Sequence, residues 1–395
     1  MKLHIIGICG TFMGGIARLA IELGHKVSGS DQNTYPPMST QLADLGVSLS
    51  DGYHSDNIPE DADIIVVGNT ISRGNPELEW TLSNNKAYTS GAQWLSENVL
   101  RDRWVLAVAG THGKTTTSSL LTWILEYCDY QPGFLIGGVP ENFGQSARLG
   151  SSSFFVIEAD EYDTAFSDKR SKFVHYHPKT LIINNLEFDH ADIFADLAAI
   201  QQQFHHLLKI VPEHGQVIWN QSQDAIKEVL DMGCWSQHKS FSFNPSSTGT
   251  DWQIKGLNPE ASEFEVNNQN QVYQGKWELI GQHNLNNAIS AIAAAHHVGV
   301  PVAQSCEALQ QFKSVKRRLE LKASINNIQI YDDFAHHPTA IEFTLRALRN
   351  KVGSERIIAV IEPRSNTMKM GVHKAAFPKA TEVADIVAYH LPSGL

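Results

Sequence analysis

The sequence predicts an α/β protein, because apolar strand candidates alternate with helix candidates along its length. The clearest unit is the apolar run Trp104 to Ala109, which a glycine-bearing loop connects to the helix candidate Ser118 to Tyr127. Clusters of polar residues follow several strand candidates, at the positions where ligand loops lie in parallel sheets. The 395 residues suffice for two or three domains, each with a core of its own.

The first segment, residues 1–103, alternates strands and helices. Strands are expected over residues 2–7, 26–30 and 62–68, with a helix that reaches Leu23. The glycine-bearing turn after the first strand suits a phosphate, but its spacing is not G-x-G-x-x-G, and tight packing of strand on helix is the alternative. Asp31 ends the second strand, where a dinucleotide fold binds a ribose hydroxyl.

The loop Gly110-Thr-His-Gly-Lys-Thr-Thr-Thr117 predicts a site for a nucleoside triphosphate. Backbone N–H groups at a helix N-terminus carry partial positive charge and suit phosphate. Lys114 adds a point charge, and the hydroxyl of Thr115 is placed to hold Mg²⁺. Val108 stands where the usual G-x-x-x-x-G-K-[ST] pattern has its first glycine. A simple turn between strand and helix is the alternative.

Two polar clusters follow the next strand candidates. Glu158-Ala-Asp-Glu-Tyr-Asp163 comes after the strand at 154–157, and Asn185-Leu-Glu-Phe-Asp-His190 comes after the strand at 180–184. Carboxylates at the ends of buried strands suggest a Mg²⁺ site that faces the phosphates. Either cluster alone could be a solvated loop. Two clusters on strands that follow one phosphate loop favour a catalytic site.

The rest of the central segment, which spans residues 104–315, is less informative. Residues 215–278 are polar and strand-like, and we expect an antiparallel appendage there. An alanine-rich helix then runs through His297. His283, Asn284 and Asn287 near its start fall about one turn apart and could contact one ligand. Helix capping by Asn284 is the alternative reading.

The third segment, residues 316–395, again predicts a β-α-β arrangement. A strand at 329–331 leads into Asp332-Asp-Phe-Ala-His-His-Pro338, and Pro338 suits the first turn of a helix that reaches Arg349. A strand at 356–361 ends in Glu362-Pro-Arg-Ser-Asn-Thr367. Three strand candidates are few for an open sheet with covered faces, so this segment is expected to be incomplete.

Composition excludes several classes of protein. Lys and Arg number 31 against 42 Asp and Glu, and the formal net charge of −11 argues against binding to nucleic acid or anionic lipid. Apolar runs stay below the ~18 residues of a membrane span, and the N-terminus does not read as a signal peptide. The four cysteines form no C-x-x-C pair, which favours reduced thiols in a cytoplasmic protein.

Five motifs, in order, resemble those of the Mur ligases, which make amide bonds on UDP-muramyl precursors of peptidoglycan. They are Gly110 to Thr117, Glu158 to Asp163, Gly281-Gln-His-Asn-Leu-Asn-Asn287, Arg317-Arg318 and Asp332 to Pro338. The resemblance implies a Rossmann-like N-terminal domain over 1–103 that binds the UDP-muramyl substrate. It further implies a central P-loop ATPase-type domain over 104–315, with a mostly parallel sheet, and a truncated Rossmann-like C-terminal domain over 316–395.

The resemblance implies an ATP-dependent ligase that acts through an acyl phosphate. Its small-molecule substrates would be UDP-N-acetylmuramate and the murein tripeptide L-alanyl-γ-D-glutamyl-meso-diaminopimelate, in peptidoglycan recycling. The alternative amine is L-alanine, in de novo peptidoglycan synthesis. Family members that use the tripeptide resemble this chain at residues 101–110, 166–176, 184–194 and 362–371, whereas those that use L-alanine more often have Pro-His-Arg-Tyr where this chain has Pro363-Arg-Ser-Asn366.

The resemblance also implies roles for single residues. ATP would contact Gly110, Thr111, His112, Gly113, Lys114, Thr115, Thr116, His283, Asn284, Asn287 and Arg318. Mg²⁺ would be held by Thr115, Glu158 and His190, with Asp160 and Glu161 as alternatives to Glu158. The UDP-sugar would contact Gly7, Gly10, Thr11, Gly14, Asp31 and Asn69. The catalytic side chains would be Lys114, His190, Asp332, His336 and Arg364, with Arg364 as a clamp on a peptide carboxylate.

The chain departs from the family pattern in two places. Several sister ligases have a carbamylated lysine some fifteen residues after the metal-site histidine, and here that position is His205, which argues against carbamylation. The family's C-terminal domain is also longer than the part that follows Lys316. Two rival classes are a Rossmann oxidoreductase, disfavoured by the glycine spacing, and a non-catalytic nucleotide-binding regulator, disfavoured by the carboxylates and His190. The sequence leaves the oligomeric state open.

Overall fold

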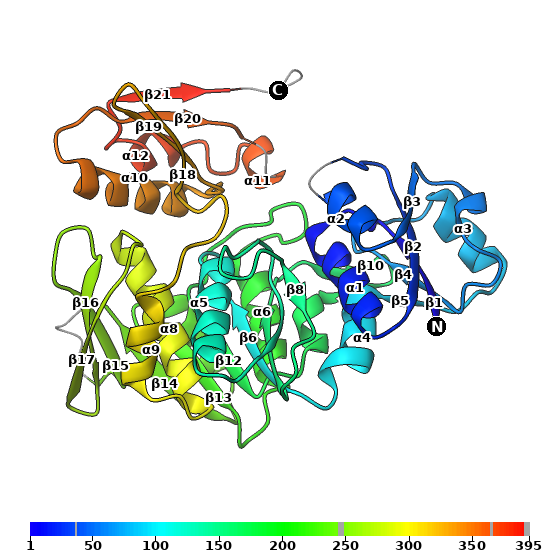
Figure 1. The fold of residues 1–395 in the computed structure, drawn as a ribbon, viewed down its shortest axis with the longest axis horizontal. Coiled ribbons are helices and arrows are strands. Elements are labelled where there is room, and N and C mark those ends of the chain that lie inside the picture. Colours follow the sequence, from blue (N-terminus) through cyan, green and yellow to red (C-terminus); the bar gives the residue numbers. More distant parts are fainter. Residues whose placement is uncertain (36–37, 244–248, 364–365, 391–395) are drawn as a thin grey trace.

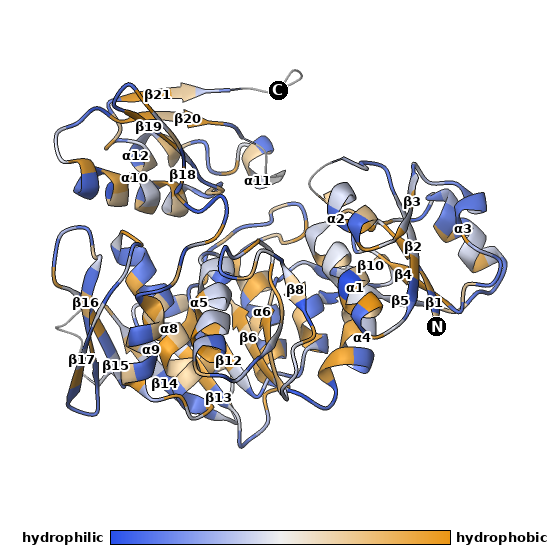
Figure 2. Ribbon diagram, viewed as in Figure 1, coloured by the Kyte–Doolittle hydropathy of each residue, from blue (hydrophilic) through white to orange (hydrophobic). Residues whose placement is uncertain are grey.

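The structure is a computed structural model that describes residues 1–395 except 36–37, 244–248, 364–365 and 391–395. Three parts follow one another along the chain, and the central part carries the largest sheet (Figure 1). In this view the first part lies to the right of the central part, and the third part lies above it. Apolar residues gather in the strands and the inner helices of the central part, whereas the connecting loops are largely polar (Figure 2).

The first part is a five-stranded parallel sheet in the order β3-β2-β1-β4-β5. The three expected strands are present with slightly different ends, but the sequence pattern does not indicate β3 and β5, which are short and mostly polar. The strands are β1 (Lys2–Ile6), β2 (Lys26–Asp31), β3 (Ser48–Asp51), β4 (Ile64–Val67) and β5 (Tyr88–Ser90). The helices are α1 (Thr11–Glu22), α2 (Met38–Asp44), η1 (Ser55–Asn57), α3 (Pro76–Ser83), α4 (Gly91–Leu95) and η2 (Ser96–Leu100).

The central part is a ten-stranded sheet in the order β17-β16-β15-β14-β13-β12-β6-β9-β7-β8. Its strands are β6 (Trp104–Ala109), β7 (Gly133–Leu135), β8 (Ala147–Arg148), β9 (Phe154–Glu158), β12 (Thr180–Ile183), β13 (Gln216–Asn220), β14 (Gln237–Ser242), β15 (Trp252–Gly256), β16 (Glu263–Asn268) and β17 (Gln271–Lys276). A separate hairpin is formed by β10 (Asp163–Ala165) and β11 (Asp168–Ser171). The helices are α5 (Lys114–Tyr127), η3 (Lys172–His175), α6 (Leu197–Leu208), α7 (Asp224–Asp231), α8 (Gln282–His297) and α9 (Val302–Leu309).

The expected antiparallel appendage over residues 215–278 is wrong for its first half. Strands β13, β14 and β15 continue the parallel sheet beyond β12, and only β16 and β17 are antiparallel. Helix α8 covers one face of this extension, on which Ile218 of β13 lies, and Val217 lies in the core of the opposite face with α6 and α7, so both are fully buried despite their polar neighbours in sequence. A parallel strand needs cover on both faces, which the local composition did not reveal.

The third part begins with a hairpin rather than with a single strand. The expected strand at 329–331 belongs to β19 (Ile328–Asp332), which pairs antiparallel with β18 (Glu320–Ile325). Asn326 and Asn327 connect them with positive φ angles of 50° and 64°, as a tight primed turn requires. The remaining elements are α10 (Pro338–Val352), β20 (Ile358–Ile361), α11 (Asn366–Lys369), α12 (Phe377–Ala380) and β21 (Ile386–Tyr389). Strands β20 and β21 are parallel.

The first and central parts share one apolar core. It joins Ile16 and Leu19 of α1 to Leu135 of β7 and Ala147 of β8. Gly15 permits this contact, because a Cβ atom at that position would collide with the side chain of Leu135. The turn that precedes α1 is therefore held in place relative to the central sheet. Within the described residues, no helix has the length and apolar character needed to cross a membrane.

Candidate active site

The phosphate loop connects β6 to α5, and two of its residues must be glycine. Gly110 and Gly113 have φ angles of 132° and 78°, in the region that side chains other than glycine rarely adopt. A Cβ on Gly110 would lie 2.9 Å from the carbonyl oxygen of Asn185, and one on Gly113 would collide with Asn287. Among the described residues no side chain caps α5. Its first N–H groups are therefore available to an anion, which fits the phosphates of a nucleotide.

Lys114 is held at the centre of this loop. Its Nζ donates to the carbonyl oxygen of Gly110 at 2.7 Å and to Oε2 of Glu161 at 2.9 Å. Burial opposes its charge, but the carboxylates of Glu161, Asp160 and Glu158 raise the pKa of Lys114 to about 12. The side chain is therefore a fixed cation beside the open helix N-terminus.

Thr115, Glu158 and Arg318 form one contact group. The hydroxyl of Thr115 donates to Oε1 of Glu158 at 3.0 Å, and Nη2 of Arg318 donates to the same hydroxyl oxygen at 3.0 Å. The other carboxylate oxygen of Glu158 accepts the N–H of Gly137 at 2.7 Å. Two oxygen donors at the mouth of the phosphate loop fit the preference of Mg²⁺ for oxygen ligands.

The structure places His190 with Glu161 rather than with Glu158. Nε2 of His190 lies 3.0 Å from Oε1 of Glu161, and Asp160 supplies a third potential ligand atom within 4.8 Å of the others. Burial opposes protonation of His190, but its contact with Glu161 raises its pKa above the ordinary value. The predicted metal ligands thus fall into two neighbouring groups, and the alternatives Asp160 and Glu161 belong with His190.

Lys172 is a site residue that the sequence reasoning missed. It begins η3, and its side chain is only 7% exposed. Its Nζ lies 2.9 Å from Oδ2 of Asp160 and 4.9 Å from the ring centre of Phe12, in the turn region of the first part. Lys172 follows Asp168-Lys-Arg-Ser, and a charged run of this kind usually indicates a solvated surface. The sequence offered no local signal that this lysine is buried.

Of the three residues at the start of α8 that were expected to contact one ligand, His283 has contacts different from those of Asn284 and Asn287. Asn287 accepts a hydrogen bond from the hydroxyl of Thr117 in α5 at 3.1 Å and donates to Asn284 at 3.0 Å. His283 instead stacks on Phe343 of α10, with ring centres 5.9 Å apart and planes at 5°. The alternative that Asn284 caps the helix is wrong, because Gly281 is the N-cap and no described side chain caps it.

In the third part, Arg318 lies at the phosphate loop and Asp332 does not. Asp332 pairs with Arg317 at 3.4 Å, and both side chains are substantially exposed. His336 directs Nδ1 at the carbonyl oxygen of Phe334 at 3.0 Å, and burial lowers its pKa. The predicted clamp Arg364 lies outside the described residues.

The first part gathers its predicted residues at the carboxyl edge of its sheet. Gly7 and Gly10 stand between β1 and α1, which begins at Thr11, and Asn69 lies in the turn after β4. Asp31 ends β2 and accepts the backbone N–H of Cys9 at 2.9 Å, which ties it to the glycine turn. A Cβ on Gly14 in α1 would collide with Met38, so this glycine serves packing.

His205 is not part of this site. Its ring stacks on the ring of Trp235 with centres 6.1 Å apart and planes at 17°. The position that holds a modified lysine in the sister ligases is therefore occupied here by a histidine of α6 whose ring packs against a tryptophan.

The fold and the site together define a nucleotide-dependent enzyme in which a phosphate loop lies between two further α/β parts. The chain belongs to the Mur ligase family. Three family models match in succession: the Mur ligase family catalytic domain over residues 2–103, the Mur ligase middle domain over 108–295 and the Mur ligase glutamate ligase domain over 317–388. These matches confirm the resemblance and the expected fold class, and the chain is an ATP-dependent ligase.

Individual members of the family differ in how similar they are to this chain. The chain is 56% identical to the UDP-N-acetylmuramate–L-alanyl-γ-D-glutamyl-meso-2,6-diaminoheptandioate ligase of Escherichia coli, over 99% of this chain and 86% of that protein. It is 32% identical to the UDP-N-acetylmuramate–L-alanine ligase of a Sulfurihydrogenibium species, over 98% of this chain and 81% of that protein. The crystal structure of a murein peptide ligase from Psychrobacter arcticus has a TM-score of 0.83 and 46% identity, and covers 100% of this chain and 85% of that chain.

Proposed function

We propose that this ligase joins UDP-N-acetylmuramate to the murein tripeptide L-alanyl-γ-D-glutamyl-meso-diaminopimelate. The observation that carries the proposal is the difference in identity between relatives, which is 56% for the E. coli ligase named for the tripeptide and 32% for the ligase named for L-alanine. The names of both relatives give UDP-N-acetylmuramate as the first substrate. The two candidate reactions therefore differ only in the amine donor, which is the tripeptide in the proposal and L-alanine in the alternative.

The reaction must activate a carboxylate that does not acylate an amine in water. The γ-phosphoryl group of ATP passes to the lactyl carboxylate of UDP-N-acetylmuramate, which gives ADP and an acyl phosphate. The α-amine of the peptide attacks the acyl carbon, inorganic phosphate leaves, and the nitrogen loses a proton as the amide forms. Positioning and charge neutralisation provide most of the catalysis in such transfers.

In the proposed assignment the phosphate loop holds the nucleotide. The open N–H groups of α5 would bind phosphate oxygens, and Lys114 would place its charge between the two reacting groups. A divalent cation, with Mg²⁺ as the expected ion, would neutralise phosphate charge when bound by Thr115 and Glu158 and in the group around His190. Asn287, which bonds to Thr117, would extend the same site towards the nucleoside.

The first part is proposed to hold the UDP-sugar at the glycine turn and Asp31. Lys172 and Phe12 lie where this turn meets the central carboxylates. We assign Lys172 to the acceptor carboxylate, because a buried ammonium group there would attract that anion and orient it towards the phosphates. The tripeptide would approach from the third part, on the side of His336, and Arg364 stays the proposed clamp on one of its carboxylates.

We propose domain boundaries after residues 103 and 315, which agree with the changes from one sheet to the next. Residues 316–395 would form the third domain, which supplies Arg318 to the phosphate loop. Closure of this domain would exclude water from the acyl phosphate. The expected cytoplasmic location stays a prediction.

Phosphate release with ATP, Mg²⁺ and UDP-N-acetylmuramate tests the proposal when the tripeptide and L-alanine are compared as amine donors. We expect kcat/KM for the tripeptide to exceed that for L-alanine at least ~100-fold, because a clamp on a peptide carboxylate is used only by the longer donor. The joined product should be identified by mass spectrometry. Equal use of both amines, or preference for L-alanine, would favour the rival donor.

A further inference from the structure

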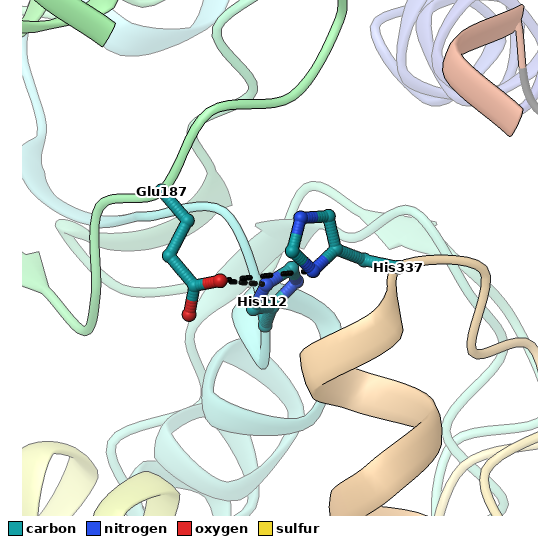
Figure 3. A group of neighbouring side chains, drawn as sticks. All are labelled: His112, Glu187 and His337. Atoms are coloured by element: carbon teal, nitrogen blue, oxygen red, sulfur yellow. Dashed lines mark ion pairs between the residues drawn. The ribbon is translucent and has the colours of Figure 1, made fainter. Parts of the chain in front are cut away.

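A second cluster of potential metal ligands includes one residue of the phosphate loop, and apart from the ATP contact expected of His112 the proposed reaction gives it no role. It consists of His112, Glu187 and His337, whose ligand atoms all lie within 4.8 Å of one another. Figure 3 shows the two imidazole rings and the carboxylate directed towards a common point. His112 comes from the phosphate loop, Glu187 from the loop after β12, and His337 from the residue before α10. The cluster therefore joins the central part to the third part.

The distances in this cluster are those of neighbouring ligands rather than of hydrogen bonds. Oε2 of Glu187 lies 3.6 Å from Nε2 of His112 and 3.7 Å from Nδ1 of His337. Both values exceed the usual limit for a hydrogen bond between these atoms. Ligands of a tetrahedral ion with bonds of about 2.0–2.1 Å lie about 3.3 Å apart. Inward shifts of a few tenths of an ångström would thus bring the oxygen of Glu187 to this separation from each of the two imidazole nitrogens.

The ring nitrogen of His112 that faces Glu187 has no hydrogen-bond partner in the part of the chain that the structure describes. Nε2 of His112 is buried, lies nearest the carboxylate and is unpartnered among the described residues. Buried polar atoms are rarely left without a partner. Nδ1 of His337 accepts the N–H of Thr339, but at 3.3 Å this contact is long, and an ion could replace it. Thr339 also donates its hydroxyl to Oε2 of Glu187 at 2.7 Å, which orients the carboxylate.

We propose that His112, Glu187 and His337 bind one divalent transition-metal ion of the Zn²⁺ class, which links the phosphate loop to the start of α10. Two imidazoles and one carboxylate are typical of Zn²⁺ or Co²⁺ and atypical of Mg²⁺, which prefers oxygen ligands. The site is separate from the groups around Glu158 and His190. Because its ligands come from two parts of the chain, the ion would hold the third part in its docked position.

Titration of the protein with Co²⁺ in excess Mg²⁺ tests the site without any measurement of activity. Mg²⁺ occupies oxygen-rich sites, while Co²⁺ bound by imidazoles at low coordination number gives visible absorption bands. We expect one equivalent of Co²⁺ to bind with such bands, and Zn²⁺ to displace it. If the unmodified chain binds no Co²⁺ under these conditions, the proposal is overturned.

Substitutions assign the ligands. His112→Asn and His337→Asn should each weaken Co²⁺ binding at least tenfold, because each removes one of three ligands. Asparagine at position 337 can still cap α10, so this variant is expected to fold. His214→Asn, which changes an exposed imidazole, is the matched control and should bind Co²⁺ as the unmodified chain does. Unchanged affinity in both ligand variants, or loss of the bands in His190→Asn instead, would overturn the assignment.

Discussion

Nζ of Lys172 and Oδ2 of Asp160 lie 2.9 Å apart, and this ion pair connects the central carboxylates to the turn region of the first part through Phe12. Asp160 in turn lies beside Glu161 and His190. Burial opposes ionisation of Asp160, but the charges of Lys172 and Lys114 hold its pKa well below the ordinary value. The ammonium group of Lys172 therefore belongs to the candidate site, although Lys172 lies in η3, which follows the carboxylate cluster and the β10–β11 hairpin in sequence.

Lys172→Met should lower kcat/KM for UDP-N-acetylmuramate at least ~100-fold, because it removes a fixed cation from the acceptor side of the site. Unfolding in urea should show a smaller free energy of unfolding by about 1–3 kcal/mol, since Asp160 loses a charged partner. Lys169→Met is the matched control, because the side chain of Lys169 is exposed and pairs with Asp163 rather than with Asp160. If the two variants had equal activity, Lys172 would have no role in substrate use.

Lys114→Ala should abolish phosphate release, with a fall of at least ~1000-fold, because the charge between the reacting groups is lost. The measurement is phosphate release with ATP, Mg²⁺, UDP-N-acetylmuramate and tripeptide. Circular dichroism should show an intact fold, because Gly113 is the N-cap of α5 and no described side chain caps this helix. Phosphate release that still depends on UDP-N-acetylmuramate would remove Lys114 from its proposed role.

Glu158→Gln should raise the Mg²⁺ concentration for half-maximal activity at least tenfold, because an amide oxygen is a weaker ligand than a carboxylate. Chelation with EDTA should stop phosphate release from the unmodified chain, and added Mg²⁺ should restore it. Glu126→Gln is a suitable control, since Glu126 pairs with Arg148 away from the phosphate loop. An unchanged Mg²⁺ dependence in Glu158→Gln would show that this carboxylate does not hold the ion.

Thermal unfolding should depend on pH through His283, whose pKa is lowered by burial to about 4 from an ordinary value of 6.5. The unfolded chain takes up this proton more readily, so the stabilising contribution is present above pH 6.5 and is lost as the pH falls towards 4. His283→Phe keeps a ring against Phe343 and removes the titration. Its midpoint of unfolding should fall less than that of the unmodified chain between pH 7 and pH 4.5.

The matched control for this experiment is His214→Phe, which changes an exposed histidine. Its unfolding midpoint should follow that of the unmodified chain across the same range of pH. The same pH dependence in His283→Phe as in the unmodified chain would show that the stacked imidazole does not contribute to acid sensitivity.

Much of the fold could be predicted because its main strands carry strong local patterns. Strand β6 has the predicted bounds, since Trp104–Ala109 is an uninterrupted apolar run that ends at a glycine. Strands β3 and β5 escaped prediction because they are short and polar, with few buried residues. The parallel extension through β13 to β15 was not predicted because α8, the helix that covers one of its faces, begins only after β16 and β17 in the sequence.

The residues of the candidate site also divide into those that the sequence indicates and those that only the structure brings to the site. Lys114, Thr115 and Glu158 could be chosen because a glycine loop and a strand end mark them locally. Lys172 and His337 could not, because nothing near them in sequence indicates burial, and of the two adjacent histidines the reasoning selected His336. The pairing of His190 with Glu161 also needed the structure, because the four carboxylates between Glu158 and Asp163 have the same chemistry.

The sequence by itself determined where phosphate can bind and which chemical groups stand at the strand ends, because glycine loops, helix starts and carboxylates act through the local backbone. Only the tertiary structure decided which of these groups meet. Arg318 reaches Thr115 across 203 positions of sequence, and Thr339 reaches Glu187 across 152. Contacts of this kind follow from how the parts of the chain pack together, and packing depends on shapes and buried areas that no local pattern of residues specifies.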